Sequence, residues 1–486
     1  MKNEVISRSD AVRALAFMGD LSMGQPIDHS LKAAWIACRI AEQLQLDHKQ
    51  SQAVAYVALL RWVGCTANAT EVANVMPDDV RGRGEVLALR PQSIKLLVAP
   101  NQILKRTREI SAIHCEVALV IANILGMRPA VIEALGCLFE TWDGSGHPHG
   151  LKGDEVPLLV FVVVLAGDIE ILTREYGAIE AQKLLLDRVD SIYPKFLVDL
   201  ACRHLAEWIE ALDRPDTHVF HAELDADEHL VELSLLADTI DLKLPWMIGH
   251  SRIVASLAGK VAAGLNLPRT TQEQIRRAAL IHGLGRVSAP NAIWNRAGPL
   301  SSADWERVRL SPYWTARAAI QIKSLEREAE IASYAYERLD GSGYFRAARN
   351  AGTPFEFRIL PVVTTWVALR APRPWRGPLT LESAVDHLQR QTLLGRFERS
   401  IVDSLIGACP EREPVKSEYK SASGILSPRE VEVLRCISNG ENNKTAARTL
   451  GLSPATVRTH VENVFRKLEC NSRAAATLKA LNLGLL

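Results

Sequence analysis

Apolar residues near the end of the chain recur at helical spacing. The stretch SPATVRTHVENVFRKL begins at Ser453, and its apolar residues fall at i, i+4, i+7 and i+11, which places them in one stripe: Val457, Val461, Val464 and Leu468. Ser453 can cap this helix because its hydroxyl accepts a bond from a free first-turn N–H, and the proline after it suits the first helical position. The opposite face is polar and partly basic. A helix of this kind suits the major groove of DNA.

Shorter helices are predicted on both sides of this stretch. Ser427 and Glu430 form a capping box that opens a first helix. Asn443 can cap a second helix that ends at Gly451, and Ser472 can cap a fourth. A short helix, a tight turn and a second helix are the plan of a helix-turn-helix.

The same stretch resembles a known family. The sequence LSPREVEVLRCISNGENNKTAARTLGLSPATVRTHVENVFRKLECNSRAAA, within residues 424–486, is similar to the LuxR/GerE-type helix-turn-helix of bacterial regulators. The resemblance implies that Arg458 and Thr459 reach base edges or phosphates. Glu462 stands at a further base-reading position, where it can accept from a cytosine amino group. Thr456 and Lys467 would contact the DNA backbone. We therefore predict these DNA-binding residues: Thr456, Arg458, Thr459, Glu462, Asn463, Arg466 and Lys467.

Residues 1–213 also read as helices, and the order of their motifs recurs further along the chain. His29 and His114 are each predicted to begin a helix, and a glutamate precedes a Gly-rich DGSG turn in both blocks. The separation between matching residues is 221 for His29/His250 and Arg61/His282, and 197 for His114/Ser311, Glu140/Glu337 and Asp143/Asp340. Constant separations within two blocks, with one length change between them, indicate a duplicated helical domain.

We therefore predict an all-α protein, with two helical bundles in tandem followed by a four-helix DNA-binding module. The bundles cover residues 1–213 and 229–408, and a polar hinge at residues 213–228 separates them. A linker rich in Pro, Ser, Glu and Lys, residues 409–424, leads to the module at residues 425–486.

The repeated bundles resemble a second family. The sequences DLKLPWMIGHSRIVASLA, ALIHGLGRVSAPNAIWNRAGPLS and YERLDGSGY look like an HD-GYP domain, a branch of the HD metal-dependent phosphohydrolases. The first copy, with ETWDGSGHPHGLKGDEVPL, looks like a more diverged version. Together the resemblance covers most of residues 25–400. For an active member it implies cleavage of phosphodiesters such as cyclic di-GMP at a two- or three-metal iron or manganese centre.

The ligand set that this resemblance requires is broken in both copies. The metal-binding positions are replaced by Arg61, Trp62, Leu138 and Phe139 in the first copy and by Gly283, Ser311, Ala335, Tyr336 and Thr364 in the second. The last carboxylate position of the first copy falls on Gly167. Asp168 lies one residue later, which turns its side chain by about 100° on a helix. We therefore expect no bi-metal centre, no catalytic residue and no cofactor.

The remaining polar residues of these clefts suggest a different ligand. Arg61 places a fixed positive charge where a metal ion would lie, and this charge suits an anion better. A small phosphate-bearing ligand would fit such a cleft. The predicted pocket residues are Arg61, His114, Asp143, His250, His282, Glu337 and Asp340.

Composition is ordinary for a globular protein, with 48% hydrophobic and 23% charged residues among 486. The net charge is +1, but residues 424–486 contain nine Lys/Arg and five Asp/Glu, a net charge of +4. Positive charge on this module fits DNA binding by the module alone. No apolar run is long enough to span a bilayer, and the chain is expected to be cytoplasmic, with no membrane contact.

These observations predict a bacterial transcription regulator that binds double-stranded DNA as a homodimer, with the HD-type region as an inactive sensory or dimerisation part. The predicted fourth helix, with Ala474, Leu478 and Leu481 on one side, is a candidate dimer contact. Two alternatives remain open. One is a metal-dependent phosphodiesterase with a DNA-binding tail, and the other is a scaffold that acts through contacts between HD regions.

Overall fold

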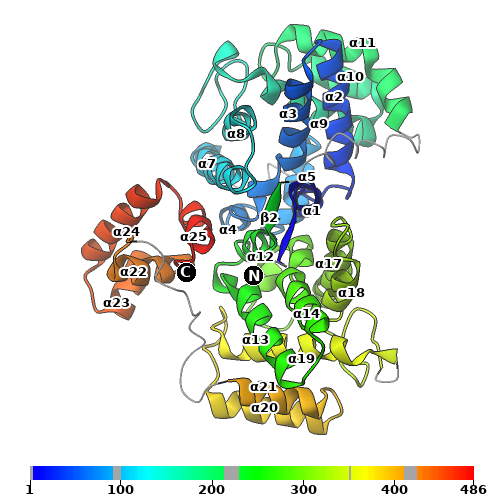
Figure 1. Ribbon diagram of the computed structural model, residues 1–486. Coiled ribbons are helices and arrows are strands. Elements are labelled where there is room, and N and C mark those ends of the chain that lie inside the picture. The colour runs from blue at the N-terminus through cyan, green and yellow to red at the C-terminus, as the bar shows by residue number, and fades with distance from the viewer. Residues whose placement is uncertain (1–3, 91–99, 213–228, 350–351, 410–423) are drawn as a thin grey trace. The chain divides into compact units, whose positions relative to one another are not determined.

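The computed structural model describes residues 4–90, 100–212, 229–349, 352–409 and 424–486. Within these ranges the chain is helical apart from one small sheet, in which β1 (Val5–Ser7) pairs with β2 (Leu230–Glu232) (Figure 1). The all-α prediction is confirmed, with this strand pair as an addition. The predicted hinge, residues 213–228, and most of the predicted linker, residues 410–423, lie outside the described residues.

The chain divides into two compact units, one formed by Ser7–Val231 and the other by Met1–Ile6 together with Glu232–Leu486. Among the helices of the described ranges, none combines the length and the apolar content that a membrane crossing requires.

The unit Ser7–Val231 is a helical bundle. Its longer helices are α1 (Arg8–Ser22), α2 (His29–Gln43), α3 (His48–Leu60), α4 (Ala69–Ala73), α5 (Asp79–Leu87), α7 (Pro100–Ile124), α8 (Pro129–Gly136), α9 (Leu158–Tyr176), α10 (Ala178–Leu186) and α11 (Lys195–Leu212), with short 3-10 turns η1 (Val63–Cys65) and η2 (Gly153–Glu155). Helix α2 packs against α3 and α9. Its buried face includes four alanines, Ala33, Ala34, Ala37 and Ala41, whose small side chains permit close approach of the neighbouring helices.

His114 does not begin a helix as predicted. It lies in the middle of α7, which already begins at Pro100. The preceding residues 104–113, LKRTREISAI, contain no glycine or proline, so nothing in this stretch interrupts the helix.

The unit that contains Glu232–Leu486 holds the second bundle. Its helices are α12 (Ser234–Asp241), α13 (His250–Gly264), α14 (Arg269–Ile281), α15 (Asn291–Trp294), α16 (Ser302–Arg309), α17 (Ser311–Ala319), α18 (Glu326–Ser333), α19 (Ile359–Arg370), α20 (Leu381–Leu393) and α21 (Arg399–Ala408), with 3-10 turns η4 (Pro245–Met247), η5 (Leu284–Ser288) and η7 (Phe355–Arg358). Helix α13 packs against α14, α19 and α21. It corresponds to α2 of the first bundle, since His250 begins it as His29 begins α2.

The two bundles repeat individual hydrogen bonds at the separation seen in the sequence. In the first bundle the Ser30 backbone N–H and hydroxyl donate to the buried Asp20 carboxylate, at 3.1 and 2.5 Å. In the second, Ser251 donates in the same way to Asp241, at 2.8 and 2.9 Å. Both residues of the second pair lie 221 positions after their counterparts, so the repeat extends to the buried polar groups.

A second repeated feature is a close approach of two backbones. A Cβ atom at Gly64 would lie 2.3 Å from the carbonyl oxygen of His114, and one at Gly285 would lie 1.9 Å from that of Ser311. No other residue type could occupy either position without moving the backbone. The same glycine is therefore required in both copies.

The C-terminal module, for which DNA binding is predicted, consists of α22 (Pro428–Ser438), α23 (Asn443–Leu450), α24 (Pro454–Leu468) and α25 (Arg473–Asn482). Ser427, Ser453 and Ser472 cap their helices as predicted. The cap of α23 is Asn442 instead of Asn443, and its side-chain oxygen accepts from two backbone N–H groups of the first turn. The sequence offers two adjacent asparagines, and the extended backbone at the first of them decides which one caps.

Helix α25 does not present the predicted dimer face. Leu478 and Leu481 are buried within the chain, and Ala474 is partly buried. The Thr477 hydroxyl forms a 2.7 Å hydrogen bond with that of Ser438 on α22. These apolar side chains therefore contribute to the interior of the chain.

Candidate functional site

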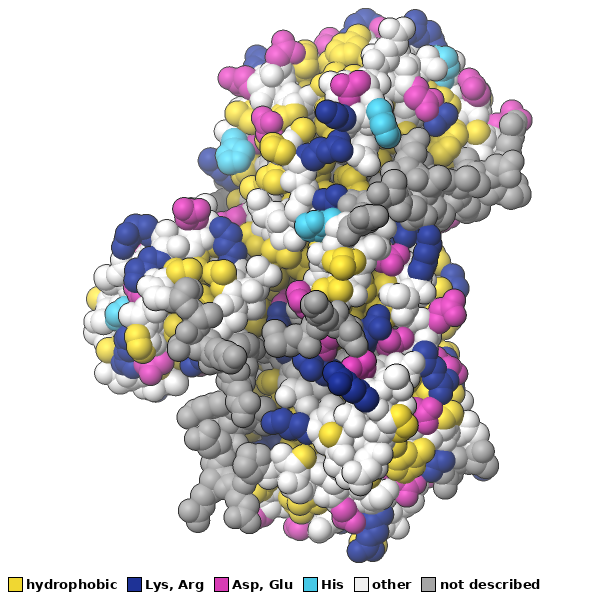
Figure 2. Space-filling model, in the orientation of Figure 1, with side chains coloured by type: hydrophobic (Ala, Val, Ile, Leu, Met, Phe, Trp, Pro, Cys, Tyr) yellow, Lys and Arg dark blue, Asp and Glu magenta, His cyan; other side chains and the backbone are white. Residues whose placement is uncertain are grey.

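The outer face of α24 is exposed, while its inner face is part of a core. Val457 and Val464 are fully buried, and Val461 packs partly buried against the cluster around Val457. The predicted DNA-binding residues lie mainly on the exposed side, with Asn463 partly buried. Figure 2 shows several Lys and Arg side chains on the surface of this module. The exposed members of the predicted set are Thr456, Arg458, Thr459, Glu462, Arg466 and Lys467.

Lys467 differs from the other residues of this set because it has a partner inside the module. Its ammonium group lies 2.7 Å from the Glu430 carboxylate. The same carboxylate accepts the backbone N–H of Ser427 in the capping box of α22. Lys467 therefore links the end of α24 to the start of α22, and this bond competes with any contact to a DNA phosphate.

The cleft of the first bundle is occupied by the side chain of Arg61. This side chain is buried, and it stacks over the ring of Trp62 with 4.3 Å between Cζ and the ring centre. Its Nη2 lies 3.6 Å from a carboxylate oxygen of Asp168, and its Nη1 has no hydrogen-bond partner among the described residues. A Cβ atom at Gly167 would lie 1.9 Å from that Nη1. The position that the resemblance assigns to a carboxylate ligand is thus a glycine that leaves room for an arginine.

The carboxylate of Asp168 is bonded to other side chains of the protein. Besides Arg61, it accepts from Nη1 of Arg188 at 3.1 Å and from the hydroxyl of Tyr193. These bonds leave it no role as a metal ligand.

The two histidines of the first bundle are also held by protein groups. Nδ1 of His29 lies 2.5 Å from the carboxylate of Glu170. Nε2 of His114 donates to the carbonyl oxygen of Arg61 at 2.9 Å. Burial lowers the pKa of His114 to about 3, so this ring is neutral near pH 7. His114 therefore supports the backbone beneath Arg61 and does not supply charge to a ligand.

Asp143 and Asp340 lie in exposed turns. The Asp143 carboxylate accepts from the backbone N–H of Ser145 at 2.9 Å, and Asp340 accepts from that of Ser342, also at 2.9 Å. Neither contacts the buried arginine of its bundle. The predicted grouping of Arg61, His114 and Asp143 in one pocket is therefore not what the structure shows, because Asp143 satisfies the donors of its own turn. Asp340 does the same and also pairs with Arg396, at 3.0 Å.

The glutamate before each Gly-rich turn holds the loop that follows it. Glu140 accepts the backbone N–H groups of the three residues 149–151, at 2.7 to 3.1 Å. Glu337 accepts those of Arg346 and Ala348, at 2.6 and 3.1 Å. Both glutamates are buried. Glu337 was predicted to line a ligand pocket. In the structure its carboxylate instead holds the loop that follows the turn.

The cleft of the second bundle is also centred on an arginine, which the sequence analysis missed. Arg286 is buried, and its Nη2 lies 2.7 Å from Nε2 of His282 and 3.1 Å from the hydroxyl of Tyr336. Its Nη1 lies 3.4 Å from the carboxylate of Asp241. A Cβ at Gly283 would lie 2.4 Å from Nη1 of Arg286. Arg286 follows His282 by four residues, and this one-turn spacing was the signal that could have identified it.

Two further cationic or potentially cationic groups lie beside Arg286. The His250 ring centre is 5.7 Å from that of His282. Burial, together with Arg286, His282 and Arg373, lowers the pKa of His250 well below its usual value. Arg373 stacks over the Trp246 ring at 4.6 Å. Burial and then the charge of Arg286 lower its pKa to about 10.

These residues do not fit the metal centre of the HD phosphohydrolases. Nδ1 of His282 donates to the carbonyl oxygen of Ala279 at 2.6 Å, so Nε2 holds the lone pair that a metal would need. Arg286 donates to that lone pair. Across the described ranges, no group of three or more His, Cys, Asp or Glu side chains is arranged to hold a metal ion. A guanidinium fills the corresponding space in each copy.

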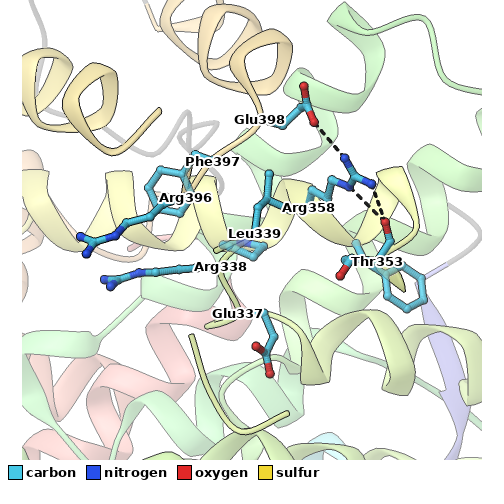
Figure 3. Close-up of a pocket in the computed structure, with 10 residues that line it drawn as sticks. Glu337, Arg338, Leu339, Thr353, Arg358, Arg396, Phe397 and Glu398 are labelled. Carbon is cyan, nitrogen blue, oxygen red and sulfur yellow. Dashed lines mark hydrogen bonds and ion pairs between the residues drawn. The ribbon is translucent and has the colours of Figure 1, made fainter. Parts of the chain in front are cut away.

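A small cavity lies behind the Gly-rich turn of the second bundle (Figure 3). Its volume is about 10 Å³, which accommodates roughly one water molecule. Arg358 pairs with Glu398 at 2.9 Å and donates to the carbonyl oxygen of Thr353, as the dashed lines in Figure 3 mark. Arg338 and Arg396 extend together away from Thr353. A cavity of this size has no room for a nucleotide.

Two family matches agree with the motifs described above. Residues 234–401 match the HD domain family, and residues 424–480 match the luxR family of bacterial regulatory proteins. Both resemblances identified in the sequence are therefore confirmed.

Known relatives of each region are similar over different lengths. The chain is 25% identical over 415 residues to the 3'3'-cGAMP-specific phosphodiesterase 3 of Vibrio cholerae serotype O1, which covers 78% of this chain and 89% of that protein. It is 50% identical over 66 residues to the transcriptional activator protein CarR of Pectobacterium carotovorum subsp. carotovorum, which covers 13% of this chain and 27% of that protein.

A solved structure shares the fold of the HD region. The crystal structure of cyclic GMP-AMP specific phosphodiesterases from V. cholerae is similar with a TM-score of 0.60 and 22% identity. The likeness covers 83% of this chain and 98% of that one. At this identity it establishes the fold alone.

Proposed function

We propose that this chain, which contains an HD domain and a luxR-family regulatory domain, is a DNA-binding transcription regulator whose HD region has no hydrolytic activity. The observation that carries the proposal is the exposed polar face of α24. Arg458 and Thr459 lie on this face, and the buried Val457 fixes the helix from the other side. A helix held in this way presents its polar side chains to a major groove.

The inactivity of the HD region is supported by the two buried arginines. Phosphodiester hydrolysis in HD enzymes needs metal ions to activate water and to polarise the phosphoryl oxygen. Arg61 and Arg286 place fixed positive charge in the two clefts, and a dication close to either would be repelled. The HD region then serves as a sensory or dimerisation part.

The regulator is proposed to act as a homodimer. One helix-turn-helix module reads few base pairs, and two half-sites are the usual way to gain affinity and specificity. Since Leu478 and Leu481 are buried, the dimer contact is assigned to the HD region instead of α25.

A second candidate function is supported by the similarity to 3'3'-cGAMP-specific phosphodiesterase 3. In this reading the chain would be a metal-dependent phosphohydrolase, such as a cyclic dinucleotide phosphodiesterase, with a DNA-binding tail. It requires metal ligands other than those that the resemblance assigns, because Trp62 and Gly283 replace the bridging carboxylates.

Genome-wide mapping of bound DNA in the native host, followed by binding assays of the purified full chain on the recovered sites, tests the first proposal. Reproducible sites with a two-fold repeated sequence are the expected result. Absence of site-specific binding would reject it. Expression with iron or manganese, metal analysis and an assay on 3'3'-cGAMP and cyclic di-GMP test the second. Stoichiometric metal with turnover would favour the enzyme.

A further inference from the structure

The cleft of the second bundle contains more positive than negative charge. Arg286 is 5% exposed, and within the described part of the chain its carboxylate partner is Asp241 alone, at 3.4 Å. Arg373 has no carboxylate within ion-pair distance among the described residues, and its Nη1 faces the sulfur of Met247 at 3.3 Å. Two guanidinium groups therefore share one carboxylate. A poorly compensated charge in a shielded site is costly, and a bound anion would remove that cost.

Neighbouring acids do not supply the missing negative charge. Asp238 is buried but is taken up by Arg252, which donates to both of its carboxylate oxygens at 2.7 and 2.6 Å. Burial raises the pKa of Asp241 to about 7, against the opposing effect of Arg286. Near neutral pH the Asp241 carboxylate is therefore only partly ionised, which increases the imbalance.

The first bundle offers a comparison, because its buried Arg61 also lies near a single carboxylate of the described chain, that of Asp168 at 3.6 Å, which pairs with Arg188 as well. Asp168 and Glu170 lie on α9 in that bundle. The residues 197 positions later in the second bundle are Thr365 and Val367, neither of which carries charge. The second copy thus lacks both acids of this helix and has gained Arg373. The charged groups around the two clefts therefore come from different positions of the same fold.

The groups around Arg286 are suitable donors for an oxyanion. No hydrogen bond joins a ring nitrogen of His250 to any described residue, and this ring lies beside His282. The Tyr336 hydroxyl accepts from Arg286, which leaves its own proton free to be donated. The Tyr336 ring stacks on that of Tyr344, with 5.3 Å between centres and 8° between planes. Guanidinium groups bind phosphate through paired N–H donors.

We propose that the former metal cleft of the second bundle is an anion site, in which Arg286 and Arg373, assisted by His250 and Tyr336, bind a phosphate group. The proposal rests on the proposed function, because it requires that no metal ions occupy this cleft. The phosphate belongs either to free inorganic phosphate or to a nucleotide. The guanidinium groups take over the charge that metal ions supply to a phosphate in an active hydrolase. The site binds phosphate and leaves it intact.

Isothermal titration of the full chain at constant ionic strength tests the site, with inorganic phosphate, adenosine monophosphate and adenosine as separate probes. We expect phosphate and adenosine monophosphate to bind and adenosine to fail. Equal affinity for the first two identifies free phosphate as the ligand, and tighter binding of the nucleotide identifies a nucleotide. Binding of adenosine as tight as that of its monophosphate, or no binding of phosphate at millimolar concentration, would overturn the proposal.

Arginine variants locate the site. Arg286→Gln and Arg373→Gln should each weaken phosphate binding at least tenfold. Arg399→Gln, which removes an equal charge from a side chain that is 83% exposed on α21, should leave it unchanged. Equal binding by the parent and both cleft variants would refute the assignment. Because Arg286 is buried, circular dichroism is recorded for each variant to check that it is folded. If Arg286→Gln unfolds, phosphate binding by the variant of the half-buried Arg373 tests the assignment.

The parent chain and the Arg373→Gln variant also distinguish a failure of the anion site from a failure of the proposed function. Arg373→Gln should bind the mapped DNA sites like the parent when phosphate is absent. Loss of specific DNA binding in the parent itself would defeat the regulator proposal and leave the phosphate result valid. Stoichiometric iron or manganese in the parent, released on addition of phosphate, would instead show that the cleft is a metal site.

Discussion

A Cβ atom at Gly283 would lie 2.4 Å from Nη1 of Arg286 and 2.8 Å from its Cζ. The buried guanidinium cannot move away without losing His282, Asp241 and Tyr336. We therefore expect Gly283→Ala to lower the free energy of unfolding by about 1–3 kcal/mol, the usual cost of overpacking. Chemical denaturation monitored by circular dichroism measures this change.

Gly407→Ala is the matched control for that variant. Gly407 lies in α21, and a Cβ added there meets nothing within 4 Å. Alanine also has the higher helix propensity. This variant should be neutral or slightly stabilising, and equal destabilisation by both substitutions would contradict the role assigned to Gly283.

DNA binding should depend on Arg458. Its exposed guanidinium lies on the outer face of α24, so Arg458→Ala should weaken binding to the mapped sites by ~1–3 kcal/mol while the fold is kept. Arg435→Ala, at an exposed position of α22, is the control and should have a smaller effect. Fluorescence anisotropy over a series of salt concentrations distinguishes a phosphate contact from a base contact. Undiminished affinity of Arg458→Ala would show that another face of the module meets DNA.

Substitutions on the two sides of α24 should have different effects, on the stability of the module for the buried side and on DNA binding for the exposed side. Val457→Asp places an unpaired carboxylate among Val433, Ala446 and Ala447, which should unfold the module at a cost of several kcal/mol. Thr459→Asp, on the exposed side, should abolish DNA binding and keep the fold. Hydrogen exchange of the module amides measures the difference. Comparable protection in both variants would place Val457 outside the core.

Stability should depend on pH through Asp241. Burial raises its pKa to about 7, although Arg286 opposes this effect, whereas an unfolded chain has the ordinary value near 4. Between these values the folded chain holds a proton that the unfolded chain has released, so stability falls as pH rises through this window. Asp241→Asn removes this titration. As the pH rises from about 5 to 7, the free energy of unfolding of the variant should therefore increase relative to that of the parent by roughly 1 kcal/mol per pH unit.

The control for the pH series is Asp403→Asn, at a carboxylate on α21 that is 65% exposed. Its difference from the parent should stay flat over the same window. A flat difference for Asp241→Asn as well would mean that Asp241 is ionised in the folded chain throughout.

The fold could be inferred because it depends on short-range patterns and on duplication. Ser427, Ser453 and Ser472 cap helices where the spacing of apolar residues had placed their starts. The start of α7 could not be inferred from the repeat alone, because Ser311 begins α17 while its counterpart His114 lies inside a longer helix. Whether a helix begins at the matched position depends on the residues that precede it, and these differ between the two copies.

The candidate sites were only partly predictable, because a residue type does not reveal its partner. Arg61 was identified as a charge in the cleft, and it is buried there. The sequence could not show that Glu337 is used up by loop N–H groups or that Lys467 is paired with Glu430. These bonds join residues brought together only by tertiary packing. Arg373 was missed because it lies outside the motifs of the resemblance.

The two buried arginines stand at different positions of the repeat. Arg61 stands at the position that His282 occupies in the second copy, while the counterpart of Arg286 in the first copy is Cys65. The guanidinium groups therefore enter their clefts from positions one helical turn apart. They cannot both descend from a single arginine that was present before the gene segment doubled. The same kind of side chain therefore fills the two clefts from two separate positions of the repeat, and not from one shared position.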